Sequence, residues 1–475
     1  MDSRLDVSAV LTWLGATALA AVCWWFGTGV HTLWWFTWLA PLPVLWLAPR
    51  VRAPMAALVA FTAYAIGGFN QWDYLHHYIG LPIPFIAYAI AMPGIALAVY
   101  VLLFRRLLLR GRSVWAALAV PTAWVAIEYI SSLLSPHGTF GSIGYTQMDA
   151  LPILQVAAVA GLWGISFLVL LVPTAIAVLL TPQAATRGRL IVAVPTAVVL
   201  AVSLAYGGWR LQAPAVSTMR IGLVSLEKPI RPALAEADGQ ALQARYVDAL
   251  NRLADQGARL VLIPETSFAT PDASVPALAQ VATQRGITVA TGIDFKGDAQ
   301  VERNMLTVLQ PAASSPATYS KHHLIPGLER QYTPGGNYTM LAGAPRIGLA
   351  VCKDMDFHDI GRAYAARNAQ LLLVPAWDFS IDGWLHGRMA IMRGVESGFA
   401  VARAPRSGRL TLSDDRGRVV AEASSEQHDA ELVGDLPLRE THTLYSRWGD
   451  WFVWLSLLGL AACLVSAWRP PVMQR

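Results

Sequence analysis

The first half of the chain is a series of apolar segments, most of them long enough to cross a lipid bilayer. A membrane-spanning helix needs roughly 20 apolar residues, because in lipid each backbone polar group must find its partner inside the helix. Seven such segments precede a long polar region and one follows it: Val7–Gly27, Leu33–Ala48, Met55–Phe69, Ile83–Phe104, Val114–Leu134, Ile153–Leu180, Leu190–Gly207 and Trp451–Ala467. The sequence therefore predicts a polytopic α-helical membrane protein with about eight spans.

Composition agrees with this prediction and argues against a nucleic-acid partner. Hydrophobic residues make up 55% of the chain and charged residues only 14%, which is far from the composition of a soluble domain. The formal net charge is +5. It does not indicate a basic face, because many of the arginines lie in short loops between the apolar segments.

The loop arginines alternate between the two ends of the spans. They are Arg4, Arg50, Arg52, Arg105, Arg106, Arg110, Arg112, Arg187 and Arg189, with Arg469 and Arg475 in the tail. The loops between them, Thr28–Thr32, Asn70–Pro82 and Ser135–Pro152, contain neither Lys nor Arg. By the positive-inside rule both termini are cytoplasmic and the polar region lies outside the cytoplasm. We therefore expect a seven-span domain over residues 1–211, an extracytoplasmic domain over 212–446, and the eighth span with a cytoplasmic tail over 447–475.

Short apolar strands alternate with helices in the polar region. Gln240–Gln256 places apolar residues at helical spacing. The predicted strands are Arg220–Leu226, Leu260–Ile263, Thr288–Ile293, Met305–Leu309, Ile347–Val351, Leu371–Val374 and Phe399–Ala404, followed by a hairpin over Leu410–Ala421. Alternation of this kind predicts an α/β domain in which helices cover a sheet.

Three chemically capable residues follow or flank predicted strands in this domain. Glu265 follows Leu260–Ile263, Lys321 lies in the segment Tyr319–Glu329, and Cys352 follows Ile347–Val351. A thiol becomes a stronger nucleophile when a base takes its proton, and a fixed cation stabilises the oxyanion that forms on an attacked ester or amide. The sequence thus indicates Glu265 as the base, Lys321 as the oxyanion stabiliser and Cys352 as the nucleophile.

Each of these residues also has a structural interpretation. A lone cysteine often fills space in a core, as expected for Cys23 and Cys463 within the spans. Glu265 would serve as a carboxylate at a helix N-terminus, and Lys321 as a surface lysine. Cys352 has no partner for a disulfide within the exported domain, although that compartment is oxidising. The coincidence of all three in one domain favours acyl-transfer chemistry.

The sequence around these residues resembles a known superfamily. Pro264-Glu265-Thr266, the Tyr-x-Lys-x-His-Leu-x-Pro of Tyr319–Pro326, Glu329 and Cys352 are similar to motifs of the carbon-nitrogen hydrolase (nitrilase) superfamily. With seven spans before the domain and one after it, the whole chain resembles the bacterial apolipoprotein N-acyltransferases. The resemblance implies an αββα sandwich of nitrilase type and a supporting role for the carboxylate of Glu329.

The resemblance also implies a reaction. An acyl chain would pass from a phospholipid to Cys352 as a thioester, and then to the N-terminal amine of an apolipoprotein. The expected location is the bacterial inner membrane, with the catalytic domain on the periplasmic side. The implied partners are the phospholipid, the apolipoprotein and the bilayer, and neither a cofactor nor a metal is expected.

Three stretches that would line the site depart from the family pattern. Lys353 and Asp354 follow the cysteine where the family has an aromatic residue and Glu, and Pro375–Phe379 replaces Asn-Asp-Ala-Trp. The first strand ends in Ser225-Leu226-Glu227-Lys228 instead of a stretch rich in Gln and Asn. We expect Lys353, Asp354 and Trp377 to line the substrate site. The departures keep three alternatives open: a membrane-anchored nitrilase-like amidase or hydrolase, an acyltransferase with another acceptor, and a membrane protein without catalysis.

Glu128 stands out as an ionisable residue within a predicted span. Such residues often have a function, although a hydrogen-bonded structural carboxylate fits the sequence equally well. His76, His77 and His137 lie in loops on the same side as the exported domain. Their spacing does not indicate a metal site.

The loop arginines predict that a reporter inserted near Ala299 lies outside the cytoplasm. A phosphatase that needs disulfides to fold should be active at this position, because disulfides persist only in an oxidising compartment. A reporter that works only in the cytoplasm should be silent there. Activity of the cytoplasmic reporter instead would reverse the orientation.

Overall fold

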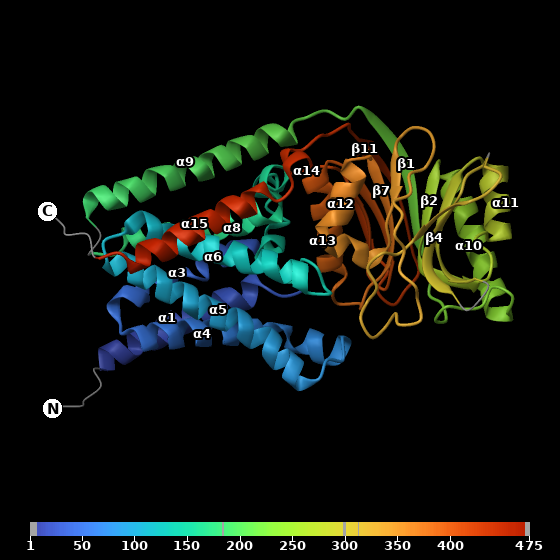
Figure 1. Ribbon diagram of the computed structural model, residues 1–475. Helices are drawn as coiled ribbons and strands as arrows, with labels where there is room; N and C mark the ends of the chain where they lie inside the picture. Colours follow the sequence, from blue (N-terminus) through green and yellow to red (C-terminus); the bar gives the residue numbers. More distant parts are fainter. Residues whose placement is uncertain (1–6, 183–184, 298–300, 312, 471–475) are drawn as a thin grey trace. The chain divides into compact units, whose positions relative to one another are not determined.

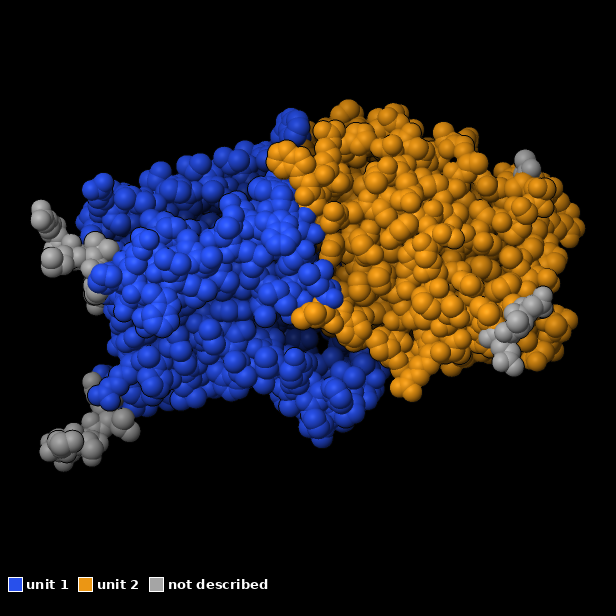
Figure 2. Space-filling model, viewed as in Figure 1, with its two compact units in different colours: residues 1–133, 141–209, 450–475 blue, residues 134–140, 210–449 orange. Residues whose placement is uncertain are grey.

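The computed structural model of the protein describes residues 7–182, 185–297, 301–311 and 313–470. Three residues named above, Arg4, Ala299 and Arg475, lie outside these ranges. The chain folds into two units (Figure 2). Unit 1 comprises Met1–Leu133, Gly141–Trp209 and Asp450–Arg475, and unit 2 comprises Leu134–Phe140 and Arg210–Gly449. The short segment Leu134–Phe140, which lies between two predicted spans, thus belongs to unit 2.

Seven helices in the described residues are long and apolar enough to cross a membrane. They are α1 (Val7–Gly27), α4 (Ala53–Gly68), α5 (Ile83–Leu109), α6 (Ser113–Leu134), α8 (Ala157–Leu179), α9 (Thr186–Leu211) and α15 (Trp451–Trp468). They coincide with seven of the predicted spans, and α8 is preceded by the short helix α7 (Leu151–Leu154). The polytopic α-helical prediction is confirmed.

The second predicted span, Leu33–Ala48, is interrupted. It forms two helices of six residues each, α2 (Trp34–Leu39) and α3 (Leu42–Leu47), and neither is long enough to cross a bilayer alone. The cause is Pro41, which has no backbone N–H to donate to the preceding turn. Ala40 and Pro41 nevertheless keep right-handed helical dihedral angles, so the segment is a proline-kinked helix rather than a loop.

Glu128 fastens α6 to the segment that follows it within unit 1. Its Oε1 accepts hydrogen bonds from Trp124 Nε1 at 2.9 Å and from Ile143 N at 2.8 Å. These contacts support the structural interpretation of this carboxylate, because they join a helix to the backbone of the next element.

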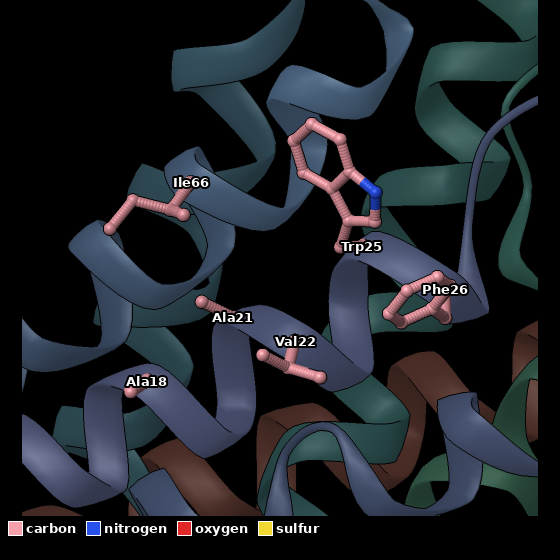
Figure 3. A pocket seen from close by; sticks show the side chains of 6 residues that line it. All are labelled: Ala18, Ala21, Val22, Trp25, Phe26 and Ile66. Atoms are coloured by element: carbon pink, nitrogen blue, oxygen red, sulfur yellow. The ribbon is translucent and has the colours of Figure 1, made fainter.

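An apolar groove lies on unit 1 between α1 and α4 (Figure 3). Its volume is about 450 Å³. It is lined by Ala18, Ala21, Val22, Trp25, Phe26 and Ile66. Apart from the indole nitrogen of Trp25, these side chains consist of carbon, and the groove therefore offers little for polar chemistry.

Unit 2 is built around two sheets of six and five strands in its described residues. The first has the order β11-β1-β2-β3-β4-β5, with β1 (Ser217–Ser225), β2 (Leu260–Thr270), β3 (Thr288–Lys296), β4 (Glu302–Leu309), β5 (Ala317–Ser320) and β11 (Ala430–Leu438). The second has the order β10-β9-β8-β7-β6, with β6 (Ile347–Leu349), β7 (Leu371–Trp377), β8 (Ala400–Arg406), β9 (Arg409–Ser413) and β10 (Val419–Ser424). The helices are α10 (Ala237–Asp255), α11 (Pro276–Arg285), α12 (His358–Ala365), α13 (Gly383–Ser397) and α14 (Leu444–Trp448).

The two sheets pack face to face, and helices cover their outer faces (Figure 1). Helices α10 and α11 lie against the first sheet, and α12 and α13 against the second. Strand β2 is buried along its whole length. Its side chains alternate, with Leu260 and Leu262 packed between the sheets and Val261 and Ile263 packed under the helices. The predicted αββα sandwich is confirmed.

Two strands have no counterpart in the sequence prediction. Strand β11 pairs antiparallel with β1 along nine residues, from Ser217↔Leu438 to Ser225↔Ala430. Its sequence contains Gly434, Asp435 and Pro437, which interrupt the alternation that marks a strand. Strand β5 is only four residues long and is too short to give a periodic signal.

A bulge in β2 shapes the chain around Glu265. The pairing of β2 with β3 shifts register between Ile263 and Phe268. Within this stretch Thr266 has a φ of 46°, an uncommon value for a β-branched residue. Gly292 on β3 faces the bulge, and a Cβ atom there would lie only 2.7 Å from Pro264 O and from Thr266 N. The glycine therefore allows the bulge to form.

Candidate active site

The sandwich of unit 2 holds the predicted catalytic residues on or directly after strands of both sheets. Glu265 lies in β2, just beyond the part that pairs with β1. Lys321 directly follows β5, and its backbone N–H donates to Asn304 O at 2.9 Å. Cys352 begins the 3-10 turn Cys352–Asp356 that follows β6. Each residue is therefore held by a strand or by a short turn next to one.

The ammonium of Lys321 joins two buried carboxylates. Its Nζ lies 2.8 Å from Oε1 of Glu265 and 3.0 Å from Oε2 of Glu329. The side chain of Lys321 is fully buried, and those of Glu265 and Glu329 are 4% and 5% exposed. Lys321 is therefore not a surface lysine. Glu329, whose carboxylate was expected to support the site, is in direct contact with Lys321.

Asn304 is a member of this cluster that the sequence analysis missed. Its Nδ2 donates to Oε1 of Glu265 and to Oε1 of Glu329, both at 2.6 Å. Ile325 N also donates to Oε2 of Glu329 at 2.6 Å. In the sequence, Asn304 is a polar residue directly before the apolar run Met305–Leu309, and this position could have marked it as a candidate site residue.

Burial and ion pairing act in opposite directions on these groups. Burial raises the pKa of Glu265, and Glu329 raises it further, although Lys321 opposes both effects. Burial alone would lower the pKa of Lys321, but the two carboxylates and the thiol of Cys352 outweigh it and raise that pKa well above its ordinary value. Lys321 is therefore a permanent cation, and Glu265 holds a proton more readily than a solvated carboxylate.

The thiol of Cys352 is held at a strained backbone position. The residue has a φ of 45°, in the left-handed region, and its Sγ lies 3.7 Å from Trp377 O. Burial raises the pKa of the thiol well above its ordinary value, and the charge of Glu265 adds to this, while Lys321 and Arg403 oppose it. The thiol is consequently protonated at neutral pH and needs a base before it can attack.

Asp354 joins the two segments that carry Lys321 and Cys352. It is fully buried, and burial raises the pKa of its carboxyl group. It accepts four hydrogen bonds, from Tyr319 Oη (2.8 Å), His322 N (3.1 Å), His323 N (2.9 Å) and Val351 N (3.0 Å). Asp354 was expected to line the substrate site. Its contacts instead position the segments that carry Lys321 and Cys352.

Lys353 contacts the segment Leu134–Phe140. Its Nζ lies 3.2 Å from His137 Nδ1 and 3.3 Å from Asp356 Oδ2. Thr139 N donates to Asp356 O at 2.9 Å. Burial, together with the charge of Lys353, lowers the pKa of His137. A neutral His137 can thus accept a hydrogen bond from the ammonium, and the contacts of Lys353 and Asp356 with this segment hold the 3-10 turn that begins at Cys352.

A second ion pair that the sequence analysis missed lies close to Cys352. Arg403 donates from both terminal nitrogens to Asp378, at 2.8 and 2.5 Å, and both side chains are buried. Arg403 lies inside a predicted apolar strand, where a charged residue is unusual. This position could have marked it as a candidate site residue. Trp377, expected to line the site, directly precedes Asp378 and contributes its carbonyl oxygen to the thiol contact.

The geometry suits nucleophilic attack on an acyl carbonyl. The cluster supplies a protonated thiol, a buried carboxylate that can take its proton, and a fixed cation for an oxyanion. Among the residues that the structure describes, no three His, Cys, Asp or Glu side chains are grouped to hold a metal ion.

Two family models match the chain, one in each half. The model described as the apolipoprotein N-acyltransferase N-terminal domain matches residues 11–175. The model described as carbon-nitrogen hydrolase matches residues 228–444, which include all the cluster residues named above except those of Leu134–Phe140.

Several relatives match along most of their length. The apolipoprotein N-acyltransferase of Geobacter metallireducens is 25% identical over 91% of both chains. That of Gloeobacter violaceus is 28% identical over 73% of this chain and 74% of its own. That of Haemophilus ducreyi is 24% identical over 89% of this chain and 90% of its own. A solved amidase from Nesterenkonia sp. is 28% identical, with a TM-score of 0.40 over 46% of this chain and 91% of its own.

Replacing Glu265 by Gln keeps the shape of the side chain but removes the proton acceptor. We expect the rate at which a small activated ester acylates Cys352 to fall roughly 10²–10⁴-fold. Lys321→Met should reduce the same rate by a factor on the order of 10²–10³, because the oxyanion loses its cation. The measurement is acyl-enzyme formation, followed by intact-protein mass spectrometry.

The exposed ion pair of Lys296 and Glu302 provides matched controls, since its Nζ–Oε1 distance is also 2.8 Å. Lys296→Met and Glu302→Gln should leave the rate near that of the parent. Lys321→Met also leaves two buried carboxylates without their cation, which destabilises the folded protein by about 3–5 kcal/mol. Glu265→Gln is therefore the decisive variant, and a near-parental rate in its folded form would remove Glu265 as the base.

Proposed function

We propose that this chain, which belongs to the apolipoprotein N-acyltransferase family and whose second half belongs to the carbon-nitrogen hydrolases, moves an acyl chain from a phospholipid to the N-terminal amine of an apolipoprotein. The acyl chain is carried on Cys352 between the two steps, and the reaction is therefore a ping-pong transfer.

In the first step Cys352 attacks the ester carbonyl of the phospholipid. Glu265 takes the thiol proton as the carbon–sulfur bond forms, and Lys321 stabilises the oxyanion. When the ester carbon–oxygen bond breaks, Glu265 gives the proton to the leaving alkoxide. The products are a thioester on Cys352 and a lysophospholipid.

In the second step the amine of the apolipoprotein attacks the thioester carbonyl. Glu265 accepts a proton from the amine as the carbon–nitrogen bond forms, and Lys321 again stabilises the oxyanion. The carbon–sulfur bond then breaks, and the departing sulfur of Cys352 takes the proton from Glu265. The amide is released, and the thiol and the carboxylate return to their starting protonation states.

The buried cluster of Lys321 with Glu265 and Glu329 carries this proposal. Burial raises the pKa of Glu265, so this carboxylate holds a proton more readily than a solvated one and can both take the thiol proton and return it. Glu329 keeps Lys321 in place when Glu265 is protonated, because Lys321 Nζ remains bonded to Glu329 Oε1 at 3.0 Å. The oxyanion site thus survives the proton transfer.

A multi-pass membrane protein suits these substrates, because both carry acyl chains that stay in the bilayer. The loop arginines support the placement of unit 2 on the periplasmic side of the bacterial inner membrane. An apolipoprotein that has crossed this membrane presents its N-terminal cysteine on that side, where the proposed second step takes place.

We expect the parental chain to restore lipoprotein N-acylation in bacteria depleted of their own activity. Cys352→Ala should fail to do so, because no thioester can form. Cys23→Ala and Cys463→Ala should both succeed, since these cysteines are buried in unit 1 and have no part in the reaction. The measurement is the mass of the N-terminal lipopeptide, which gains one acyl chain on N-acylation.

The same experiment distinguishes acyl transfer to the apolipoprotein from hydrolysis, in which water is the acceptor. Release of free fatty acid from the phospholipid, without a gain in lipopeptide mass, would identify a hydrolase and contradict the transfer step. Rescue by Cys352→Ala at parental level would contradict the nucleophile itself.

A further inference from the structure

A second group of cations borders the thiol at the ends of three strands. Lys228 lies just after β1, Arg406 ends β8, and Trp377 ends β7. Lys228 is 7% exposed, and its Nζ donates to Thr266 O at 2.8 Å. Arg406 Nη2 donates to Lys228 O at 2.7 Å. The two basic residues are thereby held next to each other and next to the bulge that carries Glu265.

Trp377 connects these cations with the nucleophile. Its carbonyl oxygen is 3.7 Å from Cys352 Sγ. Its ring centroid is 5.9 Å from Lys228 Nζ and 4.6 Å from Arg406 Cζ. Cations at such distances interact with the face of an indole ring. A ligand that binds both cations therefore lies beside the residue that contacts the thiol.

Unlike the ion-paired cations of the site, the buried Lys228 and the partly buried Arg406 lack a carboxylate partner. Lys321 and Arg403 are both ion-paired, whereas neither Lys228 nor Arg406 forms an ion pair with any residue that the structure describes. Arg406 Nε and Nη1 are buried and donate to no acceptor, and the buried Oγ1 of Thr266 is also without a partner. Buried donors of this kind normally find an acceptor, and here they remain available for one.

The surrounding charges add to the excess of positive charge around Lys228 and Arg406. Burial, Arg406 and Arg231 lower the pKa of Lys228 to about 7, while Glu265 and Glu227 oppose the shift. Arg231 adds a third positive charge, and its buried Nε is likewise unpaired. Like charges gathered in a partly buried site destabilise a fold. An anion that enters the site relieves their repulsion and favours the charged form of Lys228.

We propose that Lys228 and Arg406 bind the phosphodiester of the donor phospholipid against the ring of Trp377. The proposal rests on the proposed function, because it names how the same site holds its donor. Phosphate oxygens suit a guanidinium fork and an ammonium, and such charge-assisted hydrogen bonds are the strong ones. The phosphate anchors the lipid while its ester carbonyl lies at Cys352, and it leaves with the lysophospholipid.

The test compares two acyl donors on the purified full-length protein in lipid nanodiscs. One donor is a phospholipid, and the other is a neutral p-nitrophenyl ester that carries no phosphate. Arg406→Gln and Lys228→Met should each lower the ratio of kcat/KM for the phospholipid to that for the ester roughly 10- to 100-fold, chiefly through KM. Arg406→Lys should recover part of the ratio, because it keeps the charge but not the fork.

Arg220→Gln is the matched control, because Arg220 is an exposed arginine of β1 that pairs with Asp435 at 2.8 Å. It should leave the donor ratio at the parental value. Unfolding temperatures close to the parental one establish that each variant is folded. An equal loss on both donors would show that the cations support the thiol chemistry instead, and no loss on either would also overturn the proposal.

A second measurement separates an anion site from the lipid reaction. Inorganic phosphate should slow alkylation of Cys352 by iodoacetamide in the parental protein, and the double variant Lys228→Met/Arg406→Gln should lose this protection. Protection without acyl transfer from phospholipid would retain the anion site but reject the proposed function. Acyl transfer from phospholipid, with the same donor ratio in the variants as in the parental protein, would retain the proposed function and reject this site.

Discussion

The ammonium of Lys321, bonded to two buried carboxylates, is the interaction on which the rest of the site depends. In the water-excluded interior such pairs are stronger than at the surface, and their geometry must be well defined to offset desolvation. Strands β2, β4 and β5 supply Glu265, Asn304 and the start of the Lys321 segment. The sheet that aligns these strands therefore also sets the charge that a reacting carbonyl meets.

The backbone around the cluster is strained, and the sandwich holds it in place. Thr266 and Cys352 both have positive φ values of about 45°, a conformation that costs on the order of 1–3 kcal/mol at each position. Gly292 makes room for the first, and the hydrogen bonds of Asp354 brace the second. The ring of Trp377 and its two cations then border the same thiol. The fold therefore tolerates local strain that positions the thiol beside the proposed anion site.

Much of this could be predicted from the sequence, and what could not has physical reasons. Long apolar segments indicate the spans except where Pro41 kinks one. Apolar strands that alternate with helices indicate an α/β domain, except for β5, which is too short, and β11, whose Gly and Pro hide its pattern. The sandwich itself was implied by the resemblance to the nitrilase superfamily. Glu265, Lys321 and Cys352 are identifiable because each follows or flanks a strand. Asn304 and Arg403 stand out as polar residues beside or within apolar runs, but their partners could not be predicted, because these contacts join different segments of the chain.

The central claim is that Cys352 receives an acyl chain from a lipid before any acceptor is present. The most direct measurement is mass spectrometry of the purified protein after incubation with phospholipid alone. The account predicts one acyl group on the peptide that contains Cys352, released by hydroxylamine as a thioester should be. An unmodified Cys352 under conditions where the acceptor becomes acylated, or an acyl group on a different residue, would contradict it.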